Sequence, residues 1–236
     1  MPVRIAKQIW FTTLFAALTG GCAAQNHFAT PTVLSDDGKS SVAFSHAEQT
    51  IKNLFPPAYC ATQRAIVTVG SKQFTCDGLL QVSLAGGHHL AIVSSFGVVT
   101  DLRLKADDSL ELVKVTPLFR EDWSRRFVAR DLRRLFVAPA NLQPAGRQAD
   151  GNIVLQVAPE ADGVTAVYLF SAEGNRWQEL DLVQNGKTFY RAVPKNYQKF
   201  AGVAAEIPSS FEVSAEAYRL ELRIAELTVP KPEGSP

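Results

Sequence analysis

The chain of 236 residues carries 24 lysines and arginines against 23 aspartates and glutamates, so it lacks the basic excess typical of a nucleic-acid-binding protein. Its hydrophobic content of 46% is sufficient for one sizeable core, and its length suits a single domain with a tether.

The N-terminus has the parts of a bacterial lipoprotein signal. Arg4 and Lys7 precede an apolar run at residues 9–18, which is too short to span a bilayer, and small residues lead to Cys22. This order predicts a lipobox, in which the thiol of Cys22 is acylated and Cys22 becomes the first residue of the mature chain. An ordinary secreted protein with a chance cysteine is the alternative, because Thr19 stands where leucine is commoner.

Cleavage would remove residues 1–21, which contain two basic residues and no acidic one, and would leave 22 basic against 23 acidic residues. The acyl chains would anchor the protein without a transmembrane helix. Ala23 follows the cysteine where an aspartate would favour the inner membrane, so we expect the periplasmic face of the outer membrane. We predict that residues 22–45 form a flexible tether, that residues 46–230 form the folded domain and that residues 231–236 form a disordered tail.

Two cysteines, Cys60 and Cys76, remain in the domain. An even pair in an oxidising compartment predicts a disulfide that closes a loop of about 15 residues. Two separate buried thiols are the alternative. No metal site is expected, because no CxxC motif is present and His88 and His89 lie next to each other on a predicted strand.

Two helices are predicted. Ser45 and Glu48 form a capping box before a segment with apolar residues at helical spacing, and the prolines at 56–57 end it. Residues 121–136 have acidic side chains at the start and arginines toward the end, as the helix dipole prefers.

Most of the remaining segments alternate apolar and polar residues with the period of β-strands. Residues 139–151 are polar and contain proline, so we predict that they form a connection. The short turns indicate an antiparallel meander of about eleven strands. The predicted fold class is therefore α+β, with a single large curved antiparallel sheet, an incomplete β-barrel, covered by two helices. The alternating runs lie at residues 65–69, 79–84, 89–94, 98–104, 110–115, 153–157, 164–170, 177–183, 188–192, 200–207, 211–215 and 218–224.

The second predicted helix has two distinct sides. Apolar side chains on one arc are candidates to line a pocket for acyl chains, with plain core packing as the alternative: Phe127, Leu132 and Phe136. Basic side chains on the other side are candidates for contact with phospholipid phosphates, with a solvated helix face as the alternative: Arg126, Arg130, Arg133 and Arg134.

Phe96 precedes Gly97 in a short connection between two predicted strands. An aromatic ring at such a turn is either buried or in contact with lipid. We predict that Phe96 lies at the tip of a hairpin and enters the bilayer.

The order of elements resembles that of the lipoprotein carrier LolA and of its outer-membrane partner LolB, itself a lipoprotein. Residues 94–97, Ser-Ser-Phe-Gly between two strands, resemble the LolB hairpin whose loop projects an apolar residue before a glycine. Residues 207–213, followed by 218–224, look like the proline-led closing strand pair of that superfamily, and residues 119–121 and 129–133 are similar to a less characterised group of LolB-like lipoproteins. The resemblance covers most of the mature chain and implies a lipid or lipoprotein cargo and a periplasmic carrier protein as partner.

The sequence therefore predicts an outer-membrane-anchored periplasmic lipoprotein that binds acyl chains and accepts or transfers lipid or lipoprotein. The alternative is an accessory lipoprotein that holds a partner protein at the membrane. An enzyme is not expected, because the G-x-S-x-G, HExxH, P-loop and GxGxxG motifs are missing and His88 and His89 should point to opposite faces of a strand. No cofactor is expected.

Overall fold

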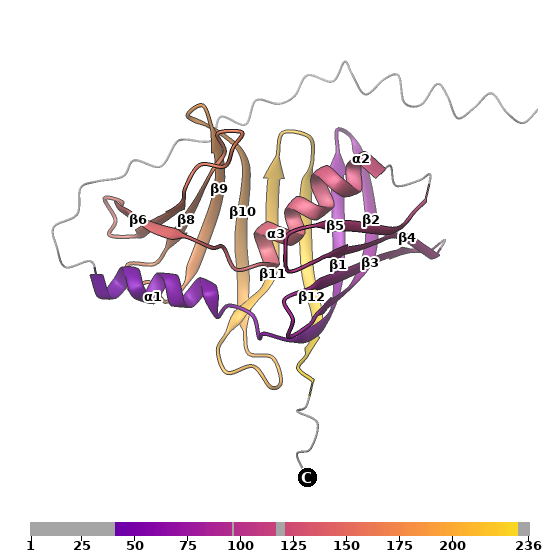
Figure 1. Cartoon of the computed structure of the whole chain (residues 1–236), viewed down its shortest axis with the longest axis horizontal. Coiled ribbons are helices and arrows are strands. Elements are labelled where there is room, and N and C mark those ends of the chain that lie inside the picture. The colour runs from indigo at the N-terminus through magenta and orange to yellow at the C-terminus, as the bar shows by residue number, and fades with distance from the viewer. Residues whose placement is uncertain (1–40, 96, 117–120, 231–236) are drawn as a thin grey trace, which may run out of the picture.

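Figure 1 shows the computed structural model, which describes residues 41–95, 97–116 and 121–230. Its strands form one antiparallel sheet of twelve strands in the order β5-β4-β3-β2-β1-β12-β11-β10-β9-β8-β7-β6. Within the described residues β5 and β6 each pair on one side only, so the curved sheet does not close into a barrel. The predicted α+β fold, an incomplete antiparallel barrel covered by two helices, is confirmed.

Two meanders make up the sheet. The first contains β1 (Tyr59–Val69), β2 (Lys72–Val82), β3 (His88–Ser94), β4 (Gly97–Leu104) and β5 (Leu110–Val115). The second contains β6 (Leu142–Arg147), β7 (Ile153–Val157), β8 (Thr165–Phe170), β9 (Trp177–Gln184), β10 (Lys187–Gln198), β11 (Ile207–Ala215) and β12 (Arg219–Thr228). Antiparallel pairing of β12 with β1 joins the two meanders.

The alternation of side chains in β12 explains why the sheet has one buried face. Leu220, Leu222 and Ile224 are buried on the concave side, whereas the charged residues between them are exposed. A half-buried antiparallel strand requires this pattern, because successive side chains point to opposite faces.

Helix α1 (Ser41–Lys52) packs against β7 and β9 at one end of the sheet (Figure 1). It begins four residues before the predicted N-cap, Ser45, so that prediction is wrong and the last residues of the predicted tether are helical. The reason is that Phe44 lies on the same side of the helix as Ala47 and is buried in the core, which favours a longer helix.

The second helical segment runs without a break through α2 (Glu121–Trp123), a π-helical turn (Ser124–Val128) and α3 (Ala129–Phe136), as predicted. We call it the covering helix, because it crosses the concave face above β12 and β1 (Figure 1). π-Helical turns occur often at functional sites. No helix among the described residues is long and apolar enough to cross a membrane.

Strands β1 and β2 begin six and seven residues earlier than predicted, one predicted strand is not formed, and one strand was not predicted. Residues 200–207 form a turn in which the Val203 N–H donates to the Phe200 carbonyl at 3.1 Å, and β11 begins only at residue 207. Strand β6 lies in the segment predicted to be a polar connection. It tolerates Pro144 because β6 is an edge strand. The open side of such a strand has no neighbour that would need the N–H that proline lacks.

The predicted disulfide is not formed, and Cys60 and Cys76 are both free thiols. They lie on the paired strands β1 and β2, but Cys60 is opposite Gln81 and Cys76 is opposite Ala65. An offset of five residues separates the two Cα atoms by roughly 17 Å, beyond the reach of a disulfide. The odd offset also places the thiols on opposite faces of the sheet, with Cys76 on the concave one.

Several predicted features lie outside the described residues. These are the signal peptide, the acylation site Cys22, the tether up to residue 40, Phe96 and the tail at residues 231–236.

Candidate functional site

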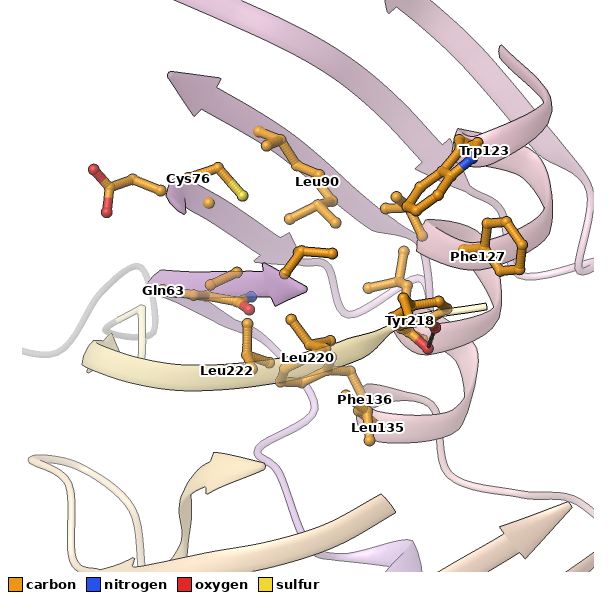
Figure 2. Close-up of a pocket in the computed structure, with 18 residues that line it drawn as sticks. Gln63, Cys76, Leu90, Trp123, Phe127, Leu135, Phe136, Tyr218, Leu220 and Leu222 are labelled. Carbon is orange, nitrogen blue, oxygen red and sulfur yellow. Dashed lines mark hydrogen bonds between the residues drawn. The ribbon is translucent and has the colours of Figure 1, made fainter. Parts of the chain in front are cut away.

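A cavity of about 90 Å³ lies between the concave face of the sheet and the covering helix (Figure 2). Its lining is almost entirely apolar. Residues of β1, β2, β3 and β12 form its floor, among them Ala65, Val67, Gly78, Ile92, Leu220 and Leu222. The covering helix forms its roof with Trp123, Phe127, Val128, Leu132, Leu135 and Phe136.

The structure brings Phe127, Leu132 and Phe136 together in this roof. Leu132 and Phe136 are buried and also belong to the hydrophobic core, so the core-packing and pocket-lining interpretations both hold for them. Phe127 is only partly buried and packs edge-on against Trp123, with 4.9 Å between ring centroids. A role of these residues in lipid binding stays a prediction.

The structure does not bring the four arginines together as one basic surface. Arg133 donates a hydrogen bond of 2.8 Å to the Asp108 carbonyl, and Arg134 is paired with Glu160. Arg126 is exposed on the covering helix. Arg133 and Arg134 thus contact different loops, and contact of the four arginines with phospholipid phosphates stays a prediction.

The fourth arginine, Arg130, belongs to a polar cluster at the edge of the cavity, together with Asp131, Tyr190 and Tyr218. We call it the Asp131 cluster. The Tyr218 hydroxyl lies 2.6 and 2.7 Å from the two carboxylate oxygens of Asp131 and donates to them, and Arg130 donates to the same hydroxyl at 3.3 Å. The Arg130 guanidinium also stacks 4.8 Å from the centroid of the Tyr190 ring. The cluster thus ties the covering helix to β10 and to the start of β12.

Burial raises the pKa of Asp131 from 3.8 to about 6, although the Tyr218 hydrogen bond and the Arg130 charge both act to lower it. Burial also raises the pKa values of Tyr190 and Tyr218 well above the usual range. The cluster therefore contains one group, Asp131, that titrates between weakly acidic and neutral pH, in contact with the roof of the cavity.

The two adjacent histidines point to opposite faces of β3, as predicted. His88 is buried, and burial lowers its pKa. His89 lies on the other face, 2.7 Å from the Asp101 carboxylate. Among the described residues, no group of three or more His, Cys, Asp or Glu side chains is placed to hold a metal ion.

Sequence reasoning did not identify Asp131 or Gln63 as site residues, although a signal existed for each. Asp131 lies four residues after Phe127 and four before Leu135, which places a carboxylate on the apolar arc of the helix. Gln63 interrupts the inward-facing series of β1 between Ala61 and Ala65.

No protein-family model and no curated protein matches the sequence. Solved structures do match. A LolA superfamily protein from Nitrosomonas europaea aligns over 81% of this chain and 94% of its own, with a TM-score of 0.60 and 10% identity. A putative outer membrane lipoprotein-sorting protein domain from Vibrio parahaemolyticus aligns over 80% and 93%, with a TM-score of 0.54 and 12% identity.

A DUF1329 family protein from Desulfovibrio piger aligns over 82% of this chain and 93% of its own, with a TM-score of 0.51 and 10% identity. Sequence identities this low show the fold alone, and each of the three alignments covers at least 80% of this chain. The chain therefore has a LolA/LolB-like fold.

Proposed function

We propose that this protein binds the acyl chains of a lipid or lipoprotein in the cavity under the covering helix and accepts or transfers that cargo at a membrane. The observation that carries the proposal is the almost wholly apolar lining of the cavity. An acyl chain gains free energy from any dry apolar space and needs few polar contacts. The description of the Vibrio relative as a lipoprotein-sorting domain supports a cargo of this class.

The size of the cavity implies that the covering helix moves when cargo binds. Sites for small molecules usually enclose about 300 Å³ or more, and this cavity measures about 90 Å³. Side-chain polar contacts hold the helix at four places: Tyr218 donates to Asp131, Thr100 lies 3.1 Å from Ser124, Arg133 donates to the Asp108 carbonyl, and Arg134 is paired with Glu160. These side-chain contacts would have to break for the helix to swing away from the sheet.

The same small volume favours a second candidate, the accessory lipoprotein that holds a partner protein at the membrane. In that function the core stays sealed and the sheet or its edge binds the partner. Binding of an apolar probe separates the two candidates, because a sealed core takes up none.

The proposed location is the periplasmic face of the outer membrane, with Cys22 as the acylated anchor. A relative described as an outer membrane lipoprotein-sorting domain supports a periplasmic or outer-membrane-related location. We propose that a periplasmic carrier protein delivers the cargo, that Phe96 enters the bilayer, and that the protein passes cargo on unchanged, without enzymatic activity. Phe74, which pairs with the cavity residue Val67 and is 53% exposed, offers an apolar rim for the transfer.

Filling the cavity from its floor should abolish cargo binding and leave the fold intact. A Cβ at Gly78 would meet no atom closer than 3.5 Å, so in Gly78→Val the side chain extends into the cavity. Valine is also a better strand residue than glycine. We expect the fluorescent apolar probe 1-N-phenylnaphthylamine to bind at least about tenfold more weakly, at an unchanged or higher Tm.

The matched control is Thr75→Val, a β-branched side chain on the exposed outer face of the same strand, which should bind the probe as the wild type does. Undiminished probe binding by Gly78→Val would place the site elsewhere. A folded wild type that takes up no probe would favour the accessory function.

Replacement of Cys22 by Ser should abolish membrane anchoring, because the sulfur atom that receives the diacylglycerol is missing. Radiolabelled palmitate should enter the wild-type protein in cells and not the Cys22→Ser variant, which should accumulate as precursor. Labelling of the variant at the wild-type level would contradict the proposed anchor.

A further inference from the structure

Gln63 is a buried amide with an unused hydrogen-bond donor. The residue is 5% exposed, and its Nε2 has no hydrogen-bond partner among the residues that the structure describes. Nearly all buried donors in folded proteins find an acceptor, because an unmet N–H loses its hydration without compensation. A donor left unmet in the wall of a cavity is therefore a candidate contact for a ligand.

The backbone of β1 turns this side chain into the cavity. Gln63 faces inward because it lies between Ala61 and Ala65 in the regular alternation of β1, and the bulge in the pairing with β12 lies on β12, where Ala225 is the extra residue. On the other side Gln63 is opposite Gly78, which has no side chain to fill the space beside it. Figure 2 shows the amide end of Gln63 directed toward the space enclosed by the covering helix.

We infer that Gln63 donates a hydrogen bond from Nε2 to the carbonyl oxygen of an ester- or amide-linked acyl chain bound in the cavity. The inference rests on the proposed function and specifies its ligand. A hydrocarbon chain alone leaves the donor unmet, whereas a linked acyl chain brings one acceptor together with an apolar tail.

The charges around the cavity favour a neutral carbonyl over a free carboxylate. Among the described residues that line it there is no lysine, arginine or histidine, whereas Asp77 and Asp131 both border it. Asp77 is exposed and paired with Arg64 at 3.0 Å, so Asp131 is the acidic group that an ionised fatty acid would approach, without a neighbouring cation in the lining, and its charge would be poorly compensated. Phospholipids supply ester carbonyls and lipoproteins also supply an N-acyl amide, and both meet the requirement.

The test uses short probes that differ only in the acceptor. Methyl dodecanoate carries an ester, N-methyldodecanamide an amide, n-tridecane neither, and dodecanoate a free carboxylate; each competes with 1-N-phenylnaphthylamine for the folded domain. Wild type should bind the ester or the amide about tenfold more tightly than n-tridecane, and more tightly than dodecanoate at pH of about 8. Tighter binding of the ester indicates a phospholipid as the source, and tighter binding of the amide indicates a lipoprotein.

In Gln63→Met, which keeps the length of the side chain and removes the donor, the preference over n-tridecane should fall to within about twofold. Binding of n-tridecane and the Tm should be unchanged or higher, because an unmet buried donor has been removed. Gln63→Leu is the second variant should the first fold poorly, and Gln81→Leu, on the exposed outer face of β2, is the control that should retain the full preference.

Two results would overturn the inference and leave the proposed function in place. One is a wild type that binds the carbonyl probes and n-tridecane equally well. The other is a Gln63→Met variant that keeps the wild-type preference. A folded wild type that binds none of the probes would overturn both proposals together.

Discussion

Gly174→Ala is expected to destabilise the domain by about 3 kcal/mol or more, because the new methyl group would push helix α1 away from the sheet. Gly174 has a φ of +73°, and a Cβ there would collide with the carbonyl oxygen of Ala43 and lie 2.8 Å from the backbone nitrogen of Ala47. Both atoms belong to the helix backbone and cannot rotate away. A shift of α1 would also break the hydrogen bond of 2.8 Å from Thr50 to the Gly174 carbonyl and uncover Phe44.

Gly163→Ala is the matched control. Gly163 has a φ of +79° and donates to the carbonyl three residues before it at 2.8 Å, as Gly174 does, but a Cβ at Gly163 would meet nothing within 4 Å. Its replacement should cost about 1 kcal/mol from backbone strain alone. Urea unfolding followed by circular dichroism measures both variants. Equal losses would mean that the close approach of α1 contributes nothing to stability.

The contrast between the two helices bears on function. Helix α1 is held by a backbone contact that admits no side chain, and it packs on β7 and β9, away from the cavity. The covering helix contains a π-helical turn and is held through rings and side-chain polar contacts, two of which are to the exposed residues Asp108 and Glu160. A movement that admits cargo is therefore expected of the covering helix, with α1 as a fixed part of the scaffold.

Periodicity was sufficient to predict most elements of the fold. The alternation in β12 and the apolar arc of residues 121–136 each predict one element and its buried side, and this needs only the sequence of that element. Strand β6 escaped detection because Pro144 interrupts its pattern, and only its place at the edge of the sheet makes that proline acceptable.

The register between two paired strands is harder to predict from the sequence. The hairpin between β1 and β2 turns at Gly70, whose φ of +58° fits a two-residue turn, and this turn fixes the register along both strands. Without it, Cys60 and Cys76 look like a pair at a convenient spacing, although the register places them on opposite faces. A strand predicted to start only at residue 65 leaves both Cys60 and Gln63 outside the sheet.

The polar part of the candidate site depends on contacts between distant segments. Asp131 and Tyr218 are 87 residues apart in the chain, and nothing local to either residue indicates that the hydroxyl meets the carboxylate. The apolar part, by contrast, follows from helical spacing, and Phe127, Leu132 and Phe136 all lie where the pattern places them.

Replacement of Asp131 by Asn is expected to stabilise the domain at neutral pH and to have little effect in acid. Burial raises the pKa of Asp131 above that of the unfolded chain, so the folded state holds a proton that the unfolded state has released. The stability that goes with this proton is fully present below a pH of about 4 and is lost as the pH rises through about 6. An asparagine carries no charge at either pH and still accepts the hydrogen bond from Tyr218.

The rise in pKa from 3.8 to about 6 is worth about 3 kcal/mol if the carboxyl is fully enclosed. Asp131 as a whole residue is only half-buried, and solvent screening reduces the expected gain to about 2 kcal/mol. Urea unfolding at several pH values between about 4 and 7 should show Asp131→Asn gaining on the wild type as the pH rises. Glu226→Gln, which removes an exposed carboxylate from β12, should follow the wild type throughout.

This pH dependence links the Asp131 cluster to the movement of the covering helix. At neutral pH the ionised Asp131 is an unfavourable group in the contact between helix and sheet, so Asp131→Asn should also hold the cavity shut more firmly. Amide hydrogen exchange of residues 124–136 should then be slower in the variant than in the wild type at a pH of about 7 and equal in both near 4. A stability difference between the two proteins that stays constant across this range would show that Asp131 titrates as an ordinary surface carboxylate and plays no part in holding the helix.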